Sequence, residues 1–369
     1  MDPRVHEHAE TLVEWCARVE SDDAVILAVA EGAHDLAVAV AEAVGERGAD
    51  LHATYAADEV TQAYLSAHEG SFGAFPHASA LFEEADVTLI LGGSRNTAAL
   101  ADVPGPTRQA FDRANQHVRE ARFATDWVST IHPTRALAQA AGMAYPAYRD
   151  FVYGAVLRDW PALAEEMARV KDRLDAGSTV QILTEDTDLS MSIEGRTAVN
   201  STASVLDDSH NLPSGEVFTA PVVESVEGQV TFDIPRTVGG RRVRDVQLTF
   251  ADGQVTDVVA AEGESAIQDV LDTDDGARRL GELGIGMNRG IDRFTDNVLF
   301  DEKMGGTVHL ALGRAYDACL PHGETPNRSA VHVDLITRMG VGSQLLIDGE
   351  PVQVDGSFWY EDEVADGSE

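Results

Sequence analysis

Histidines and acids in the second half of the chain have types and spacings that suit metal binding. His332 and Asp334 stand two residues apart in SAVHVDLITR, so in a strand both side chains project from one face. His309 follows Glu302 in the stretch DEKMGGTVHLALGRAY. Carboxylate oxygens with one or two imidazoles are ligands that zinc, cobalt and manganese accept. The pattern therefore indicates a metal site.

Two further acids lie in short motifs, Glu216 in GEVFTAP and Glu282 in GELGIGMN. Each candidate has an ordinary alternative, because a lone His309 would serve as a core histidine and Glu216 as a solvated loop acid. Their coincidence in one half of the chain favours a shared site. Four carboxylates would balance two divalent cations, and such a pair of ions can share a hydroxide that attacks a hydrolysable bond.

The motifs GEVFTAP, GELGIGMN, DEKMGGTVHLALGRAY and SAVHVD, in this order, resemble those of the dinuclear metallo-aminopeptidases typified by aminopeptidase T and aminopeptidase S. The resemblance implies an α/β N-terminal domain, a β-rich catalytic domain, and a homodimer that encloses the sites. It also implies two divalent metal ions, zinc, cobalt or manganese. The metal ligands that it implies are Glu216, Glu282, Glu302, His309, His332 and Asp334.

The reaction expected from this resemblance is hydrolysis of the first bond of a peptide with a free N-terminus, by a hydroxide that bridges two ions. We expect Glu282 to bridge the ions and Tyr316 to stabilise the developing oxyanion. Lys303 is one of only two lysines, the other being Lys171. It either binds a substrate carboxylate or only fixes its loop, and the sequence does not decide between these roles.

Several elements must position these residues. Through residue 176, short apolar runs alternate with amphipathic ones, as in DAVILAVA, HDLAVAVAEAVGERGA, LHATYAA and DVTLILGG. This alternation predicts an α/β domain with a mostly parallel sheet. The turn LGGSRNTAA lacks the spacing of a nucleotide-binding loop, so we interpret it as an ordinary strand-to-helix turn. The stretch WPALAEEMARVKDRLDAG predicts a helix that ends at Gly177.

The second half predicts a β-rich α+β domain, from residue 177 to 369, with short alternating strands and Asp-Gly turns. A helix is expected over ESAIQDVLDTDDGARRLGEL, which would place Glu282 at a helix end. We assign catalysis to this second domain. Residues 1–176 are expected to serve as the scaffold for dimerisation and substrate access.

Composition limits the partners. The 63 Asp and Glu residues against 27 Lys and Arg give a net charge of −36, which repels nucleic acid and anionic membranes. Acids spread over a folded chain favour adaptation to a salt-rich cytoplasm over the alternative, an acidic surface that binds a cationic partner. Cys16 and Cys319 are too few for a disulfide framework, and the N-terminal sequence has no export signal pattern. We therefore expect a cytoplasmic protein.

Two alternative functions stay open at this stage. GIGMNRG, residues 284–290, has glycines that could belong to a nucleotide-binding α/β oxidoreductase, although its spacing departs from the dinucleotide fingerprint. A non-catalytic metal-binding protein would use the same ligands. Release of amino acids from peptides, lost with a chelator and restored by metal, separates the three hypotheses.

Overall fold

The computed structural model describes residues 2–361, and within them the chain forms two compact units. The first comprises the residues through Trp160 together with Ala203–Ser214. The second comprises Pro161–Thr202 and the residues from Gly215 onward. The boundary predicted at residue 176 falls at the end of a helix that belongs mostly to the second unit.

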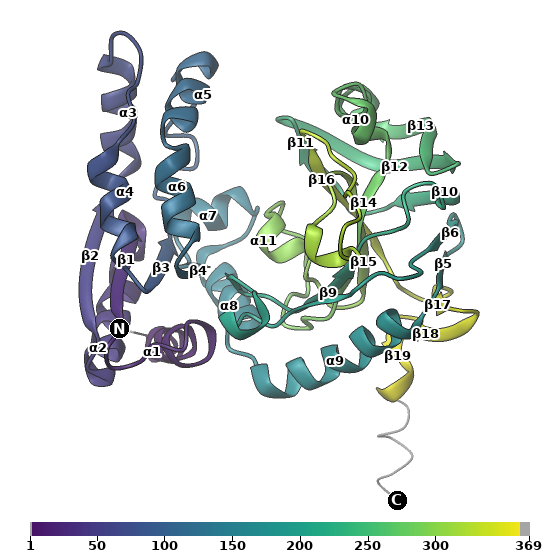
Figure 1. Ribbon diagram of the computed structural model, residues 1–369, viewed down its shortest axis with the longest axis horizontal. Helices are drawn as coiled ribbons and strands as arrows, with labels where there is room; N and C mark the ends of the chain where they lie inside the picture. The colour runs from purple at the N-terminus through teal and green to yellow at the C-terminus, as the bar shows by residue number, and fades with distance from the viewer. Residues whose placement is uncertain (1, 362–369) are drawn as a thin grey trace, which may run out of the picture. The chain divides into compact units, whose positions relative to one another are not determined.

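The first unit is built on a parallel sheet in the order β2-β1-β3-β4-β8 (Figure 1). Its strands are β1 (Ala24–Ala30), β2 (Asp50–Ala56), β3 (Val87–Gly92), β4 (Asp126–Ile131) and β8 (Asn211–Leu212). Continuous apolar runs such as AVILAVA suit strands covered on both faces. The predicted α/β domain and its parallel sheet are confirmed.

Helices connect and cover these strands. They are α1 (Arg4–Glu10), α2 (His34–Arg47), α3 (Asp58–Ala67), α4 (Pro76–Glu83), α5 (Gly105–Ala114), α6 (Gln116–Phe123), α7 (Arg135–Ala140) and α8 (Tyr145–Val156), with a π-helical turn at Thr11–Cys16 and a 3₁₀ turn at Glu31–Ala33. In the α3–α6 group, α4 packs against α6 and α3 against α5 (Figure 1). The predicted helix α2 is closed by Gly48, which adopts the left-handed conformation that glycine tolerates best.

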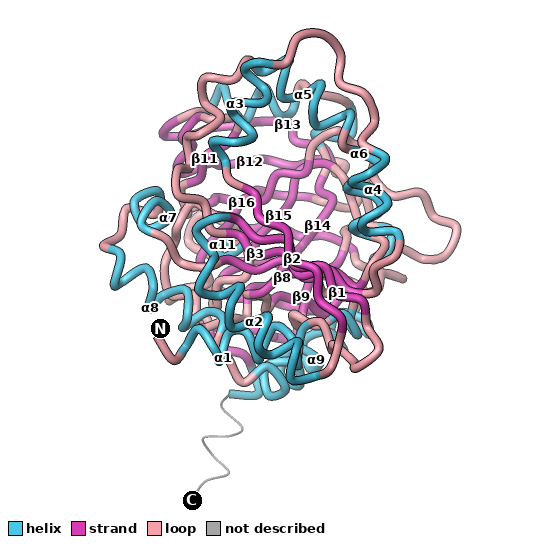
Figure 2. The backbone as a smooth tube through the Cα atoms, turned by 90° about the vertical axis from the view of Figure 1, so that its left-hand side faces the viewer, coloured by secondary structure: helices cyan, strands magenta, loops and turns pink. Residues whose placement is uncertain are grey.

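The second unit begins at Pro161, in the first turn of α9 (Trp160–Ala176), the helix predicted from its amphipathic pattern. Leu163, Met167, Val170 and Leu174 recur at helical spacing and are all buried. Two antiparallel sheets follow, and Figure 2 shows their strands in magenta. The larger sheet has the order β11-β12-β10-β6-β5-β17-β18-β19, with β13 paired to β12.

The strands of the larger sheet are β5 (Thr179–Leu183), β6 (Asp188–Ser192), β10 (Glu227–Phe232), β11 (Arg236–Val238), β12 (Arg241–Ala251), β13 (Gln254–Glu262), β17 (Gln344–Ile347), β18 (Glu350–Val354) and β19 (Ser357–Phe358). The predicted Asp-Gly turns are confirmed. Asp252 and Gly253 join β12 to β13 with positive φ at both residues, as tight hairpins require.

The smaller antiparallel sheet has the order β16-β15-β14-β9-β7, and β16, β15 and β14 run beside one another in Figure 2. Its strands are β7 (Val199–Ser201), β9 (Glu216–Thr219), β14 (Leu280–Gly286), β15 (Thr307–Gly313) and β16 (His332–Arg338). Short helices α10 (Glu264–Leu271) and α11 (Val298–Asp301) flank these strands in sequence.

The prediction of a helix end around Glu282 is wrong. Helix α10 ends at Leu271, and GELGIG lies in β14, which is fully buried between β9 and β15. Its glycines disfavour a helix, and pairing on both edges satisfies the strand's backbone. None of the helices among the described residues is both long and apolar enough to cross a membrane.

Candidate metal centre

One face of the smaller sheet gathers most of the predicted ligands. Opposed residues of neighbouring strands share a face, and Glu282 on β14 lies opposite Ala311 on β15, which lies opposite Asp334 on β16. Glu216, the first residue of β9, pairs with Gly286 on β14. Small residues thus alternate with ligating ones across the strands, which leaves space over the face.

His309 occupies one such space. It lies opposite Gly284, and a Cβ added at Gly284 would stand 2.0 Å from Nε2 of His309. Contacts this short do not occur between real atoms, so any side chain at position 284 would displace the imidazole. The glycine in GELGIG is therefore required for the placement of His309.

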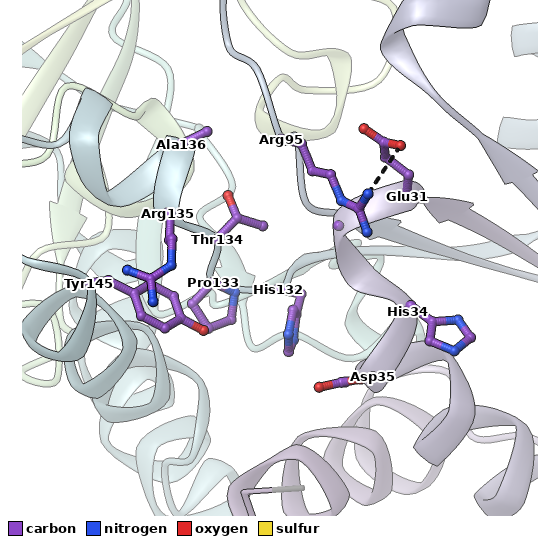
Figure 3. A pocket seen from close by; sticks show the side chains of 11 residues that line it. Glu31, His34, Asp35, Arg95, His132, Pro133, Thr134, Arg135, Ala136 and Tyr145 are labelled. Carbon is purple, nitrogen blue, oxygen red and sulfur yellow. Dashed lines mark ion pairs between the residues drawn. The ribbon is translucent and has the colours of Figure 1, made fainter.

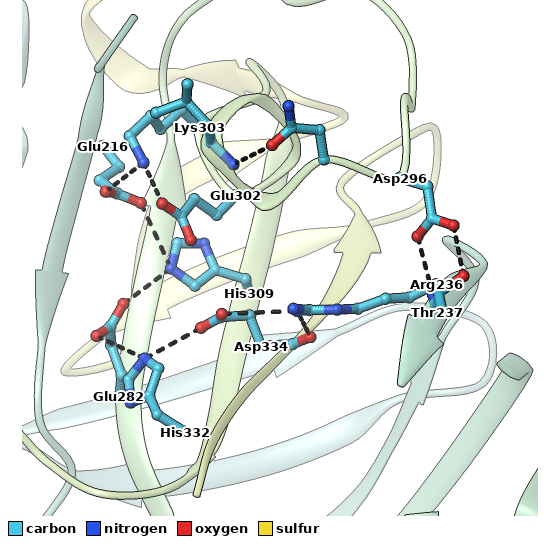
Figure 4. A network of polar contacts seen from close by, with 12 residues as sticks. Glu216, Arg236, Thr237, Glu282, Asp296, Glu302, Lys303, His309, His332 and Asp334 are labelled. Atoms are coloured by element: carbon cyan, nitrogen blue, oxygen red, sulfur yellow. Dashed lines mark hydrogen bonds and ion pairs between the residues drawn. The ribbon is translucent and has the colours of Figure 1, made fainter. Parts of the chain in front are cut away.

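The carboxylate of Glu282 lies between the two imidazoles (Figure 4). Its Oε1 is 2.9 Å from Nε2 of His309, and its Oε2 is 3.7 Å from Nε2 of His332. The second ring nitrogen of His332, Nδ1, contacts the carbonyl oxygen of Arg314 at 2.8 Å. That contact orients the ring so that Nε2 faces the acids.

Asp334 completes the lower part of the cluster in Figure 4. Its Oδ1 is 3.3 Å from Nε2 of His332, and its Oδ2 is 3.5 Å from the guanidinium of Arg236. Single ligand atoms of Glu282, His332 and Asp334 all lie within 4.8 Å of one another, as the donors of one metal ion would.

The upper part of the cluster contains Glu216, Glu302 and Lys303. The ammonium of Lys303 lies 3.2 Å from Oε1 of Glu216 and also contacts the carboxylate of Glu302. Oε2 of Glu216 is 3.6 Å from Nε2 of His309, which links the two parts. Lys303 is fully buried, so it cannot reach a substrate in this conformation and instead holds the two acids together.

The loop before β15 brings Glu302 and Lys303 to the site. Helix α11 ends at Asp301, and Gly306 then takes a positive φ of 77°. This conformation suits glycine and lets the chain turn directly into β15. Glu302 and His309 therefore converge although six residues separate them in sequence.

Tyr316 lies beside the imidazole of His332, with ring centroids 5.2 Å apart in an edge arrangement. Burial of the hydroxyl and, to a smaller extent, the nearby Glu282 carboxylate together raise the pKa of Tyr316 to about 12. The hydroxyl therefore keeps its proton at neutral pH and can donate a hydrogen bond.

The electrostatics of the cluster favour cations. Burial alone would lower the histidine pKa values, but the hydrogen bond with Glu282 and the charges of Glu216 and Glu282 raise the pKa of His309 to about 9. Asp334 and Glu282 likewise raise the pKa of His332 to about 9 against the effect of burial. Burial raises the pKa of Glu216. Protons thus compensate the clustered carboxylates wherever no other cation does so.

The residues fit divalent metal ions. Two buried acid oxygens, Oε2 of Glu216 and Oδ1 of Asp334, accept no hydrogen bond of good geometry among the described residues, and the imidazole nitrogens near them lie at 3.6 Å and 3.3 Å. Such atoms are costly to bury unless a cation binds them. The donor set of four carboxylates and two imidazoles suits zinc, cobalt or manganese. All six predicted ligands therefore lie in one continuous cluster, with Glu302 joined to it through Lys303.

Sequence reasoning missed several supporting residues. Arg236, which contacts both the backbone and the carboxylate of Asp334, comes from β11 in the other sheet of the unit. Nothing in its local sequence indicates this contact. Gly284 and Ala311 acquire their roles only from strand register, although the glycine-rich GELGIG was a visible signal. GIGMNRG starts in an antiparallel strand, whereas a dinucleotide fingerprint requires a parallel strand followed by a helix.

Comparisons with known proteins agree with the arrangement. A family model described as thermophilic metalloprotease (M29) matches residues 1–357. Aminopeptidase 2 of Geobacillus stearothermophilus is 36% identical over 173 residues, which cover 41% of this chain and 40% of that protein. Aminopeptidase T of Thermus thermophilus is 38% identical over 162 residues, which cover 40% of this chain and 36% of that protein. The chain thus spans about two fifths of the length of these curated relatives.

Solved structures extend the likeness to the whole chain. Wild-type AmpT from Thermus thermophilus superposes with a TM-score of 0.83 at 26% identity, over 97% of this chain and 99% of that one. A 2,5-dihydroxypyridine dioxygenase from Pseudomonas putida KT2440 gives a TM-score of 0.60 at 12% identity, over 97% of each chain. The second likeness shows the fold alone.

Proposed function

The chain belongs to the thermophilic metalloprotease (M29) family, and from that premise we propose that it is a metal-dependent aminopeptidase. Its substrates are peptides with a free N-terminus, from which it releases the first residue. Relatives named aminopeptidases support this activity. The observation that carries the proposal is the position of Glu282, whose two carboxylate oxygens each face a different imidazole.

We propose that the cluster holds two divalent ions. One set of donors is Glu282, His332 and Asp334, and the other is Glu216, Glu302 and His309, with Glu282 shared between both sets. When bound, two such ions supply a hydroxide nucleophile near neutral pH and a Lewis acid for the scissile carbonyl. Zinc, cobalt and manganese all match the donor chemistry.

The protein's own groups orient the substrate. The partly exposed Tyr316 hydroxyl, protonated at neutral pH, donates a hydrogen bond to the oxygen that gains negative charge in the transition state. A free α-amino group is a cation, and the carboxylates of this face attract it. Lys303 keeps Glu216 and Glu302 in place and makes no substrate contact, because its side chain is buried.

We also propose that the protein is a cytoplasmic homodimer, as its resemblance to aminopeptidases T and S implies. The net charge of −36 supports adaptation to high salt. The first unit is proposed to serve as the dimer and access scaffold.

The proposal is tested with matched peptides that differ only at the N-terminus. The metal-loaded protein should release the first residue from a free peptide and leave its N-acetylated counterpart intact. A similar rate on both peptides would contradict exopeptidase selectivity. Absence of hydrolysis on a panel of free peptides, by protein with full metal content, would favour a non-catalytic metal-binding protein.

A further inference from the structure

The first unit contains a candidate ligand-binding site that lies outside the metal cluster. A cavity of about 640 Å³ is lined by residues that directly follow β1, β3 and β4 (Figure 3). This volume is within the range of about 300–1,000 Å³ typical of small-molecule sites. The cavity is therefore large enough for a small organic molecule.

The position of the cavity matches the place where open parallel sheets bind ligands. From β1 the chain continues to β2 on one side, whereas β3 lies on the other side of β1. This reversal leaves a crevice at the carboxyl ends of β1 and β3, where ligands of such sheets are found. Gly32 permits the crevice to form, since a Cβ at this position would stand 2.1 Å from the carbonyl oxygen of Gly93.

A buried polar group without a partner lines the cavity. His132 is 7% exposed, and its Nδ1 has no hydrogen-bond partner within the described part of the chain. Burial lowers the pKa of His132 by more than the nearby Asp35 carboxylate raises it, so the ring is neutral and offers both a donor and an acceptor. Since Nδ1 is enclosed by protein, a ligand in the cavity would hydrogen-bond to the other ring nitrogen, Nε2, which is not enclosed in this way.

The charges around the cavity are balanced and separated. Figure 3 shows Arg135 stacked on Tyr145 on one side, with Glu31 and Asp35 on the other. Glu31 is 3.7 Å from the guanidinium of Arg95, so these two charges largely compensate each other. Within residues 2–361, the exposed side chains of Asp35 and Arg135 form no ion pair, and both line the cavity. One uncommitted cation thus faces one uncommitted anion across the cavity.

We propose that this cavity binds a small zwitterion, a free amino acid or a short peptide. Its carboxylate pairs with Arg135, and its ammonium pairs with Asp35. His132 hydrogen-bonds to the part of the molecule between these ends. Asp35 would repel a simple anion and Arg135 would repel a simple cation. A molecule with both charges can pair with both side chains. The inference is independent of the proposed peptidase activity.

Calorimetric titration of the metal-free full chain tests this inference, because hydrolysis is then absent. The probes are alanine, alanyl-alanine, N-acetyl-alanyl-alanine, alanyl-alaninamide and inorganic phosphate. We expect saturable binding of alanine or alanyl-alanine, and the tighter of the two identifies the ligand source. Removal of either charge from the dipeptide should weaken binding at least tenfold. Phosphate binding as tight as that of the zwitterions would overturn the proposal.

Variants assign the binding to this cavity. Arg135→Gln should weaken dipeptide binding at least tenfold but leave the affinity of the amide unchanged, because the amide has no carboxylate. Asp35→Asn should likewise weaken dipeptide binding at least tenfold, because the ammonium loses its partner. The affinity of the N-acetyl peptide, which has no ammonium, should stay unchanged. Arg108→Gln, at an exposed position of α5 outside the cavity, is the matched control. Dipeptide binding that none of these variants changes would overturn the proposal.

A spectroscopic measurement covers the case in which a variant does not fold. In ¹⁵N-labelled wild-type protein, saturation with the zwitterion should shift the ring nitrogen signals of His132. Unchanged ring signals at saturation would place the ligand elsewhere and overturn the assignment.

Discussion

Gly284→Ala tests the geometry of the metal centre without altering any proposed ligand. The added methyl carbon would stand 2.0 Å from Nε2 and 2.1 Å from Cε1 of His309. Non-bonded carbon and nitrogen atoms approach no closer than about 3.5 Å without repulsion. The imidazole must therefore move by more than an ångström, and its 2.9 Å contact with Glu282 is lost.

The magnitude follows from two effects. Overpacking a buried strand costs about 1–3 kcal/mol of unfolding free energy. Misorientation of a metal-ligating imidazole typically lowers metal affinity by about 10- to 100-fold. We expect both changes, measured by thermal unfolding of the metal-free protein and by metal titration. The hydrolysis rate should fall together with metal occupancy.

Gly45→Ala is the matched control for this variant. Gly45 lies in α2, and a Cβ there would have no atom within 4 Å. The same change should leave metal affinity unaltered and raise stability by up to about 1 kcal/mol, because alanine is the better helix former. Wild-type metal affinity in Gly284→Ala would refute the conclusion that His309 binds metal from this position.

Four further predictions separate the roles within the site. Glu282→Gln should abolish metal uptake and activity together, as measured by metal analysis and peptide assay, and retained two-metal stoichiometry would remove this residue as the bridge. Lys303→Met should destabilise the metal-free protein by about 3–5 kcal/mol, because two buried acids lose their cation. Chemical unfolding measures this loss. The control is Lys171→Met, at the chain's other lysine, which pairs with Asp175 at the surface and should cost less than about 1 kcal/mol. Equal losses of stability in the two variants would contradict the buried role of Lys303. Tyr316→Phe should lower kcat by about 10²–10³ with metal content unchanged, and an unaltered kcat would exclude oxyanion stabilisation. Both site imidazoles have pKa values raised to about 9, so they are protonated in the metal-free protein at pH 7 and lose their protons as metal binds. A pH-indicator dye should therefore report proton release on metal binding, and this release should diminish as the pH approaches 9.

Local patterns in the sequence predicted much of the fold. The apolar run of β1 and the amphipathic run of α9 each carry their own periodicity, so each could be assigned in isolation. The Asp252-Gly253 turn required only local backbone preferences. GELGIG could not be assigned in this way, because a short apolar run becomes a strand only when neighbours pair with both edges. Its partners, β9 and β15, come from distant parts of the chain.

The metal site likewise combines features that local sequence predicts with features that only the assembled fold determines. The types of the six ligands were visible as motifs, whereas the register that sets His309 against Gly284 is a property of the assembled sheet. The role of Lys303 required knowledge of its burial. The cavity in the first unit was not foreseen, because Asp35 and Arg135 follow different strands and approach only through the order of the parallel sheet. The turn containing Arg95 has only the sequence features of an ordinary strand-to-helix connection.

Titration of the metal-free protein with zinc, cobalt or manganese tests the central claim most directly, when amino-acid release from a free peptide is followed at each addition. We predict no release before metal is added, and a rise that saturates at two ions per chain. Full amino-acid release by the metal-free protein, or a release rate that does not depend on bound metal, would contradict the account.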